Sequence, residues 1–253
     1  LINSIKLLRI FSEAQDLELD IHPHALRLIN RDLHLINNDF QKNAAANEIF
    51  LRILTSKKAP ETALRRLNEA GVFGTFIPDF GRIVAQMEFS MYHSYTVDEH
   101  TIRAIGILSR IEGGFYADDM PNVTKAMRDL TSRRALYVAL FLHDIAKGQG
   151  GEHSELGADL ALRLCPRLGL STEETETEAW LVREHLTMSD IAFKRDFDDP
   201  KTIKDFVSIV KSTERLKLLT VLTCADIRAV GPKTWTNWKS GLLRWVYLKA
   251  LEY

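Results

Sequence analysis

The chain has 253 residues, which is enough for one large domain or a domain with a helical appendage, and enough to bury a sizeable core. Its 45% hydrophobic and 26% charged residues exclude a disordered or fibrous protein. With 33 Lys and Arg residues against 34 Asp and Glu residues, the net charge of −1 provides no broad positive field. We therefore expect neither a nucleic acid nor a membrane as a partner.

The only cysteines, Cys165 and Cys224, lie in apolar contexts with helical spacing. Two cysteines are too few for a disulfide framework or a cysteine-rich zinc site, which predicts a reducing, cytoplasmic setting. No apolar run approaches the roughly 18 residues of a membrane-spanning helix. The chain begins at Leu1 without a Met or a signal pattern, so we expect it to be a fragment of a longer protein.

Apolar residues recur at helical spacing along most of the chain, and sustained alternation of period two is hard to find. An all-α fold is therefore predicted. In chain order, the first helices are followed by a short helix from Pro60 to Gly71, and the glycine- and proline-containing stretch 74–81 predicts a loop. We place a boundary there, with residues 1–80 as an N-terminal helical segment and residues 81–253 as the main helical bundle.

Two apolar helices of the main bundle carry ionisable residues. Residues 134–142 are apolar on nearly every side of a predicted helix, and this helix runs directly into His143 and Asp144. In a later helix, apolar residues of the stretch 216–230 surround Asp226. Because an unpaired charge is strongly unfavourable inside an apolar core, we expect these acids to bind a metal ion or to pair with a basic side chain.

If Asp226 pairs with a basic side chain and not with a metal ion, that side chain would be an arginine such as Arg228 or Arg103. A further histidine, His100, lies beside an apolar stripe, and on its own it is more often a core or surface histidine. Together, however, one histidine, a His-Asp pair and a distant acid make a set of nitrogen and oxygen ligands. Such a set suits Mn²⁺, Mg²⁺, Fe²⁺ or Zn²⁺ and not a metal selected by thiolates.

The order of these motifs resembles that of a known family. The matching stretches are residues 76–81, 93–100, 141–148, 153–157, 185–189 and 225–232, and together they extend over nearly the whole chain. The series resembles the HD superfamily of metal-dependent phosphohydrolases and, more closely, the central part of bacterial bifunctional uridylyltransferase/uridylyl-removing enzymes, which modify the PII nitrogen-signalling protein. The resemblance implies a substrate, uridylylated PII, from whose tyrosine UMP is removed by hydrolysis.

By this resemblance the metal ligands are His100, His143, Asp144 and Asp226. A divalent ion, in the first place Mn²⁺ or Mg²⁺, would make a bound water more acidic and neutralise charge on phosphoryl oxygens. Asp144 would hold this ion or bridge two ions, and is thus also a candidate catalytic residue. Lys147 lies four residues after His143, on the same face of the predicted helix, and would stabilise the remaining phosphate oxygens.

His153 and His185 follow in the order that two-metal HD phosphodiesterases give their additional histidines. We therefore expect one ion at least, and the two histidines favour a second, weaker site. The alternative is that both histidines form supporting hydrogen bonds around the first site or lie exposed.

Members of the bifunctional family also carry a nucleotidyltransferase domain, with a Gly-Ser motif and paired aspartates, and ligand-sensing domains. Neither is found here. The triplet Asp196-Phe-Asp198 imitates the paired acids, but it lacks the Gly-Ser motif and precedes Asp199-Pro200, so a loop or cap is predicted. We expect uridylyl transfer to be absent. Two alternatives stay open, namely an HD phosphohydrolase acting on a nucleotide or cyclic dinucleotide, and a non-catalytic HD module that docks PII.

Overall fold

The computed structural model describes residues 4–87, 95–196, 199–231 and 233–253, and every structural statement below refers to them. Within these residues the chain is built from helices, with one isolated β-bridge between Met87 and Thr96. The predicted all-α class is confirmed. No helix in the described part of the chain has the length and apolar character needed to cross a membrane.

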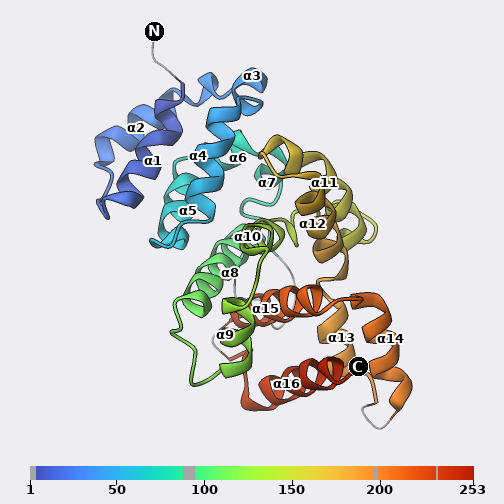
Figure 1. Cartoon of the computed structure of the whole chain (residues 1–253). Coiled ribbons are helices and arrows are strands. Elements are labelled where there is room, and N and C mark those ends of the chain that lie inside the picture. The colour runs from blue at the N-terminus through green and yellow to red at the C-terminus, as the bar shows by residue number, and fades with distance from the viewer. Residues whose placement is uncertain (1–3, 88–94, 197–198, 232) are drawn as a thin grey trace.

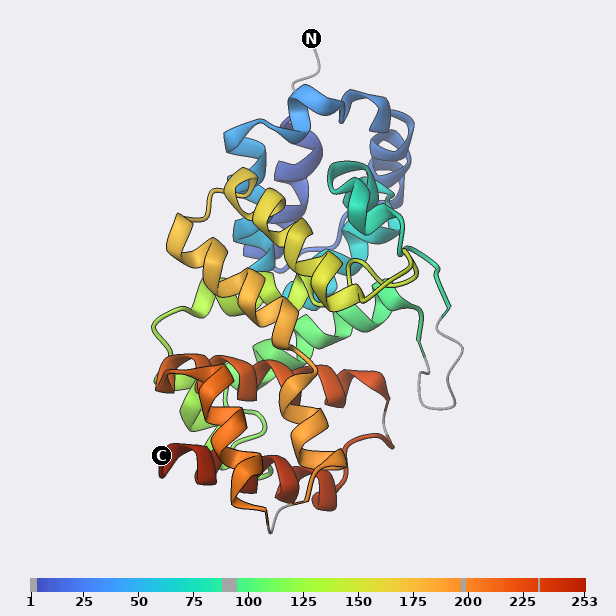
Figure 2. The same cartoon turned by 90° about the vertical axis from the view of Figure 1, so that its right-hand side faces the viewer.

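The helices form an elongated body with the N-terminal helices at one end and the C-terminal helices at the other (Figures 1 and 2). Their bounds are α1 Lys6–Asp16, α2 Pro23–Arg31, η1 Leu33–Leu35, α3 Asn38–Gln41, α4 Ala44–Leu54, α5 Pro60–Glu69, α6 Val72–Phe76, α7 Pro78–Gly81, α8 Val97–Glu112, α9 Pro121–Arg128, α10 Arg133–Leu142, α11 His153–Arg167, α12 Thr172–Glu184, α13 Thr187–Lys194, α14 Pro200–Val210, α15 Thr213–Val230 and α16 Asn237–Leu251.

The stretch 74–81, predicted as a loop, is largely helical. It contains the end of α6 and the whole of α7, which begins at Pro78. Proline is well tolerated at the first position of a helix, where its missing N–H is not needed. In addition, the side chains of Phe76, Ile77 and Phe80 are fully buried. The loop prediction is wrong because Gly74 lies within α6 and Gly81 ends α7, and both short helices belong to the core.

Aromatic side chains pack across the predicted boundary at residue 80. The ring of Phe73 stacks on that of Phe80 with centroids 3.8 Å apart, and the ring of Phe141 in α10 lies 5.6 Å from Phe73 and 5.8 Å from Phe50. All four side chains belong to one continuous hydrophobic core. The boundary therefore stays a prediction, and the N-terminal segment directly supports α10.

Three helices in the middle of the molecule carry part of the site. Helix α8 packs against both α10 and α15 (Figure 1). Residues 135–142 of α10 are all buried, as its apolar sequence predicts, and α15 is buried along most of its length. Such helices gain their stability from packing and not from an exposed polar face. A charged side chain on a buried face of these helices must therefore find its partners inside the molecule.

The close crossing of α5 and α8 depends on Gly106. A Cβ atom at this position would lie 2.9 Å from Glu61 Cβ and closer still to the Glu61 carboxylate. Real Cβ atoms do not approach other atoms so closely, so alanine would force the helices apart. Gly241 in α16 is the opposite case, because an added Cβ would meet nothing within 4 Å.

We expect Gly106→Ala to lower the melting temperature and Gly241→Ala to raise it. Alanine in a helix is more favourable than glycine by roughly 0.5–1 kcal/mol, and only at Gly241 is this gain free of a clash. Thermal unfolding followed by circular dichroism measures both variants under the same conditions. A Gly106→Ala variant as stable as Gly241→Ala would contradict the close approach of α5 to α8.

Candidate metal centre

Six side chains that the sequence singles out converge where five helices meet. They are His100 in the first turn of α8, His143 and Asp144 directly after α10, His153 at the start of α11, His185 directly after α12, and Asp226 in α15. Their ligand atoms fall into two groups of three. We call these the first group, containing His100, His143 and Asp226, and the second group, containing Asp144, His153 and His185.

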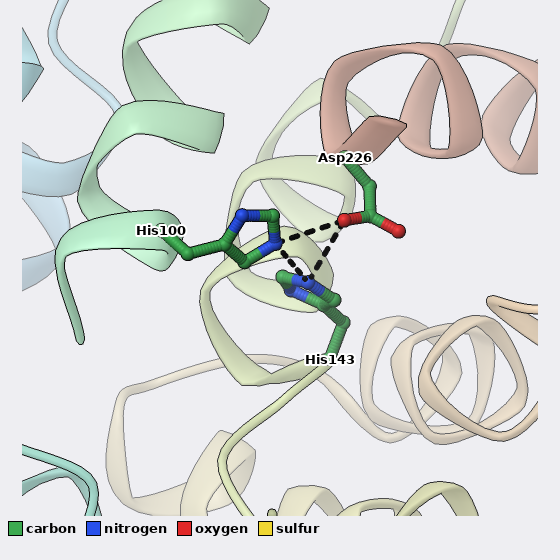
Figure 3. Close-up of side chains that lie close together, drawn as sticks. All are labelled: His100, His143 and Asp226. Atoms are coloured by element: carbon green, nitrogen blue, oxygen red, sulfur yellow. Dashed lines mark hydrogen bonds and ion pairs between the residues drawn. The ribbon is translucent and has the colours of Figure 1, made fainter. Parts of the chain in front are cut away.

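The first group brings two imidazoles and one carboxylate together (Figure 3). His100 Nε2 lies 2.9 Å from Asp226 Oδ1, and His143 Nε2 lies 3.5 Å from the same oxygen. The two Nε2 atoms are 3.3 Å apart. Both histidine side chains are almost fully buried, whereas 16% of the Asp226 side chain is exposed. The group is therefore reached by solvent from the side of Asp226.

The second group has the same composition of two imidazoles and one carboxylate. His153 Nε2 and His185 Nε2 each lie 3.8 Å from Asp144 Oδ1, which is too far for a hydrogen bond. His153 Nε2 is buried and has no hydrogen-bond partner in the described part of the chain. A buried polar atom without a partner is unfavourable. A cation bound between these three atoms would remove that penalty.

Asp144 connects the two groups. Its Oδ1 faces the second group, while its Oδ2 lies 3.3 Å from His143 Nε2 and 3.7 Å from His100 Nε2 in the first. The side chain is only 3% exposed. One carboxylate thus presents one oxygen to each group of histidines, which is the arrangement that a bridge between two ions requires.

His143 and His185 are oriented by the same local contact. Nδ1 of His143 lies 2.6 Å from the carbonyl oxygen of Leu140, and Nδ1 of His185 lies 2.7 Å from that of Val182. In the neutral ring, Nδ1–H donates to this carbonyl and leaves the lone pair of Nε2 directed into the group. Each histidine also caps the carboxyl end of its helix, where the helix dipole favours a cation.

The chain at the His-Asp pair differs from the prediction of a continuous helix. Helix α10 ends at Leu142, and residues 143–148 form successive turns. The turns bring Lys147 Nζ to within 2.8 Å of Asp144 Oδ2. The prediction that Lys147 shares a helical face with His143 is therefore wrong. Lys147 instead forms an ion pair with the carboxylate of Asp144, between the two groups. Its side chain is 18% exposed, so the ammonium group lies near solvent.

The alternative of an arginine ion pair for Asp226 is wrong. The guanidinium of Arg228 pairs with Asp119, and that of Arg103 lies over the ring of Tyr95, 4.1 Å from its centroid. The partners of Asp226 in the described residues are the two histidines of the first group.

The histidines of the N-terminal segment are not part of this site. His22, His24 and His34 are exposed there. His93 of the 93–100 motif and the last two residues of the triplet Asp196-Phe-Asp198 lie outside the described residues.

The burial of the site shifts the pKa values of its members in opposite directions. Burial alone would lower the pKa of His143, but the charges of Asp144 and Asp226 raise it to about 10. Burial lowers the pKa of His185 to about 4, assisted by the charge of His143. Burial would raise the pKa values of Asp144 and Asp226, but the neighbouring histidines hold both well below the ordinary value.

These shifts predict which histidine must lose a proton to bind metal. Without metal, His143 remains an imidazolium as the pH rises through neutrality toward about 10, and His185 remains neutral until the pH falls to about 4. A metal ligand must offer a free lone pair. We therefore expect a diamagnetic ion such as Zn²⁺ to expel a proton from His143 and none from His185 at pH 7.5. Nitrogen-15 NMR of labelled histidines measures both, and a neutral His143 in metal-free protein would contradict the assignment.

Comparison with known proteins gives a consistent picture. Residues 97–227 match the HD domain family, and residues 3–76 match the uridylyltransferase GlnD third domain. The chain is 58% identical over 248 residues to the bifunctional uridylyltransferase/uridylyl-removing enzyme of Azospirillum brasilense, 59% over 251 residues to that of Rhodospirillum rubrum, and 57% over 248 residues to that of Novosphingobium aromaticivorans.

Each of these alignments covers 98% of this chain but only 27%, 26% and 27% of the respective relative. The chain thus spans about a quarter of the length of the curated relatives it matches. The stretch 97–227 is more than half of the chain and contains all six converging side chains. On this evidence the chain belongs to the HD domain family.

Proposed function

We propose that this chain is a metal-dependent phosphodiester hydrolase that removes UMP from the uridylylated tyrosine of the PII protein. The observation that carries the proposal is the position of Asp144, with one carboxylate oxygen toward each group of ligands. Two groups that share a carboxylate suit a reaction in which charge develops on both the attacking and the leaving oxygen. Hydrolysis of a phosphodiester is such a reaction.

HD domains bind divalent metals, and the donor set here narrows the choice. The two groups offer imidazole nitrogens and carboxylate oxygens, and both cysteines of the chain are buried free thiols that belong to neither group. Such ligands suit Mn²⁺ or Mg²⁺, with Fe²⁺ or Zn²⁺ as alternatives. We propose that His100, His143 and Asp226 hold one ion, that His153 and His185 hold a second, and that Asp144 binds both.

The residues of the chain have separate tasks in this reaction. The bound metal would make a water molecule acidic enough to attack phosphorus near neutral pH. The partial exposure of Asp226 gives the substrate a direction of approach. Lys147 lies near solvent beside Asp144, and its ammonium group is close enough to the centre to offset negative charge on the phosphoryl group. We therefore assign Lys147 a role in stabilising the transition state.

The names of the relatives support the removal of a uridylyl group, since they combine uridylyl transfer with uridylyl removal. We infer that the removing reaction is the hydrolytic one. In the proposed step, water adds its oxygen to phosphorus, the bond between phosphorus and the tyrosine oxygen breaks, and the tyrosine oxygen gains a proton. The products are UMP and free tyrosine on PII. We propose that the transfer reaction is carried by parts of the longer enzymes that this chain does not match.

The proposal predicts the activities of a small set of variants. His143→Ala and Asp226→Asn should abolish UMP release because each removes a ligand of the first group. Lys147→Ala should retain its metal but lower turnover by about 10²–10³-fold, as expected when one charge-stabilising donor is lost. His24→Ala, at an exposed position far from the site, is the control. The assay is UMP release from uridylylated PII with Mn²⁺, with circular dichroism to verify folding.

The same assay separates the proposal from its rivals. Turnover of bis-p-nitrophenyl phosphate without UMP release would indicate a phosphohydrolase for another nucleotide. Binding of PII with no turnover of either substrate would indicate a docking module. Full activity of His143→Ala or Asp226→Asn would remove the proposed metal centre.

A further inference from the structure

Asp98 lies two residues before His100, in the first turn of α8, and its side chain is buried. Acids in a first helical turn usually stabilise the positive end of the helix from a solvent-exposed position. The carboxylate of Asp98 instead makes two specific contacts outside its helix. Its Oδ2 accepts a hydrogen bond from Asn68 Nδ2 at 2.8 Å, and its Oδ1 accepts one from the backbone N–H of Ala85 at 3.1 Å.

The contact with Ala85 orders the connector that precedes α8, residues 82–87. Ala85 has a φ of 59°, a left-handed conformation that is unfavourable for alanine and persists only where neighbours hold it. The next residue, Gln86, accepts the first N–H of α8, that of Val97, at 3.0 Å. Its side chain also packs on Gly148, where a Cβ would lie 3.0 Å from Gln86 Cδ. The connector therefore touches both the start of α8 and the turns after the His-Asp pair.

The contact with Asn68 ties the same turn of α8 to α5 in the N-terminal segment. A second contact joins these two elements at the neighbouring residue, where Arg65 pairs with Glu99 at 2.6 Å. Farther along, Arg110 of α8 pairs with Glu61 of α5 at 2.9 Å. Helix α5 thus contacts α8 near both of its ends. The contacts near the beginning of α8 involve the turn that carries His100.

The two metal groups depend differently on this turn. His100 belongs to the first group, and the second group contains no residue of α8. We propose that Asp98 is a positioning residue for the first metal site, and that through Asn68 and the connector it couples the N-terminal helical segment to metal binding there. The inference rests on the proposed metal centre. It predicts that loosening Asp98 weakens the first site selectively.

Asp98→Asn is the test variant. Asparagine keeps the size of the side chain but removes its negative charge and replaces one acceptor oxygen by an NH₂ group. This group would either face the N–H donor of Ala85 or face Asn68 and require the Asn68 amide to turn over. The double variant Asn68→Asp/Asp98→Asn restores the pairing, because the new amide can donate to the new carboxylate while its oxygen accepts from Ala85. Arg110→Gln is the matched control, since it breaks an ion pair between the same two helices ten residues after His100.

The first readout is Mn²⁺ affinity in a His185→Ala background, which leaves the first group intact. We expect Asp98→Asn to weaken binding by about 10–100-fold, as is usual when the support of a metal ligand is lost. The double variant should recover most of the affinity, and Arg110→Gln should match the parent even if its melting temperature falls. Unchanged affinity in Asp98→Asn, or equal losses in Asp98→Asn and Arg110→Gln, would overturn the proposal.

The second readout does not require metal. The backbone N–H of His100 donates to the Thr96 carbonyl at 2.8 Å, so hydrogen exchange at this amide reports opening of the first turn. We expect exchange to accelerate about 10-fold or more in metal-free Asp98→Asn and to return toward the parent rate in the double variant. If the parent bound no Mn²⁺, the metal centre would be wrong, and unchanged exchange would separately refute the positioning role. If Asp98→Asn fails to fold, Asn68→Ala replaces it in both readouts. This variant keeps the hydrogen bond between Asp98 and the backbone N–H of Ala85.

Discussion

The burial of the Asp144 carboxylate is the constraint on which the site depends. A carboxylate that is only 3% exposed requires positive charge or hydrogen-bond donors on every side. Here Lys147 and the protonated His143 satisfy Oδ2, while Oδ1 faces His153 and His185 beyond hydrogen-bonding distance. On the side of Oδ1, His153 Nε2 is buried without a hydrogen-bond partner in the described residues. Divalent ions between these groups would supply the charge that burial demands, and would replace the proton on His143.

The fold places histidines around this carboxylate by bringing the ends of several helices together. His143 and His185 each close a helix and donate to a carbonyl three residues back, so their free nitrogens are fixed by local geometry. His100 lies instead in the first turn of its helix. Its position depends on how α8 is held, which gives the contacts of Asp98 with α5 and the connector their importance. Ligands from helix ends and ligands from helix starts thus need different kinds of support.

The sequence predicts the fold class well, because helical periodicity is a local property that survives in almost every segment. It also predicts the converging residues, since an acid such as Asp226 within an apolar helix is conspicuous without any structure. The division of the six side chains into two groups follows from the resemblance to two-metal enzymes, but which carboxylate oxygen of Asp144 faces which group is not visible in the sequence. The turn after Leu142 is missed for a related reason, as residues 143–147 have no glycine or proline to mark the helix end. The role of Asp98 is hidden because its partners, Asn68 and Ala85, are distant in sequence.

The most direct test of the shared carboxylate is crystallographic. Crystals of the chain grown with Mn²⁺ and measured near the manganese absorption edge would locate each ion by its anomalous scattering. We predict two separate peaks, one enclosed by His100, His143 and Asp226 and the other by His153 and His185, with one oxygen of Asp144 bound to each. A single peak with His153 and His185 uncoordinated, or a second peak that does not contact Asp144, would contradict the account.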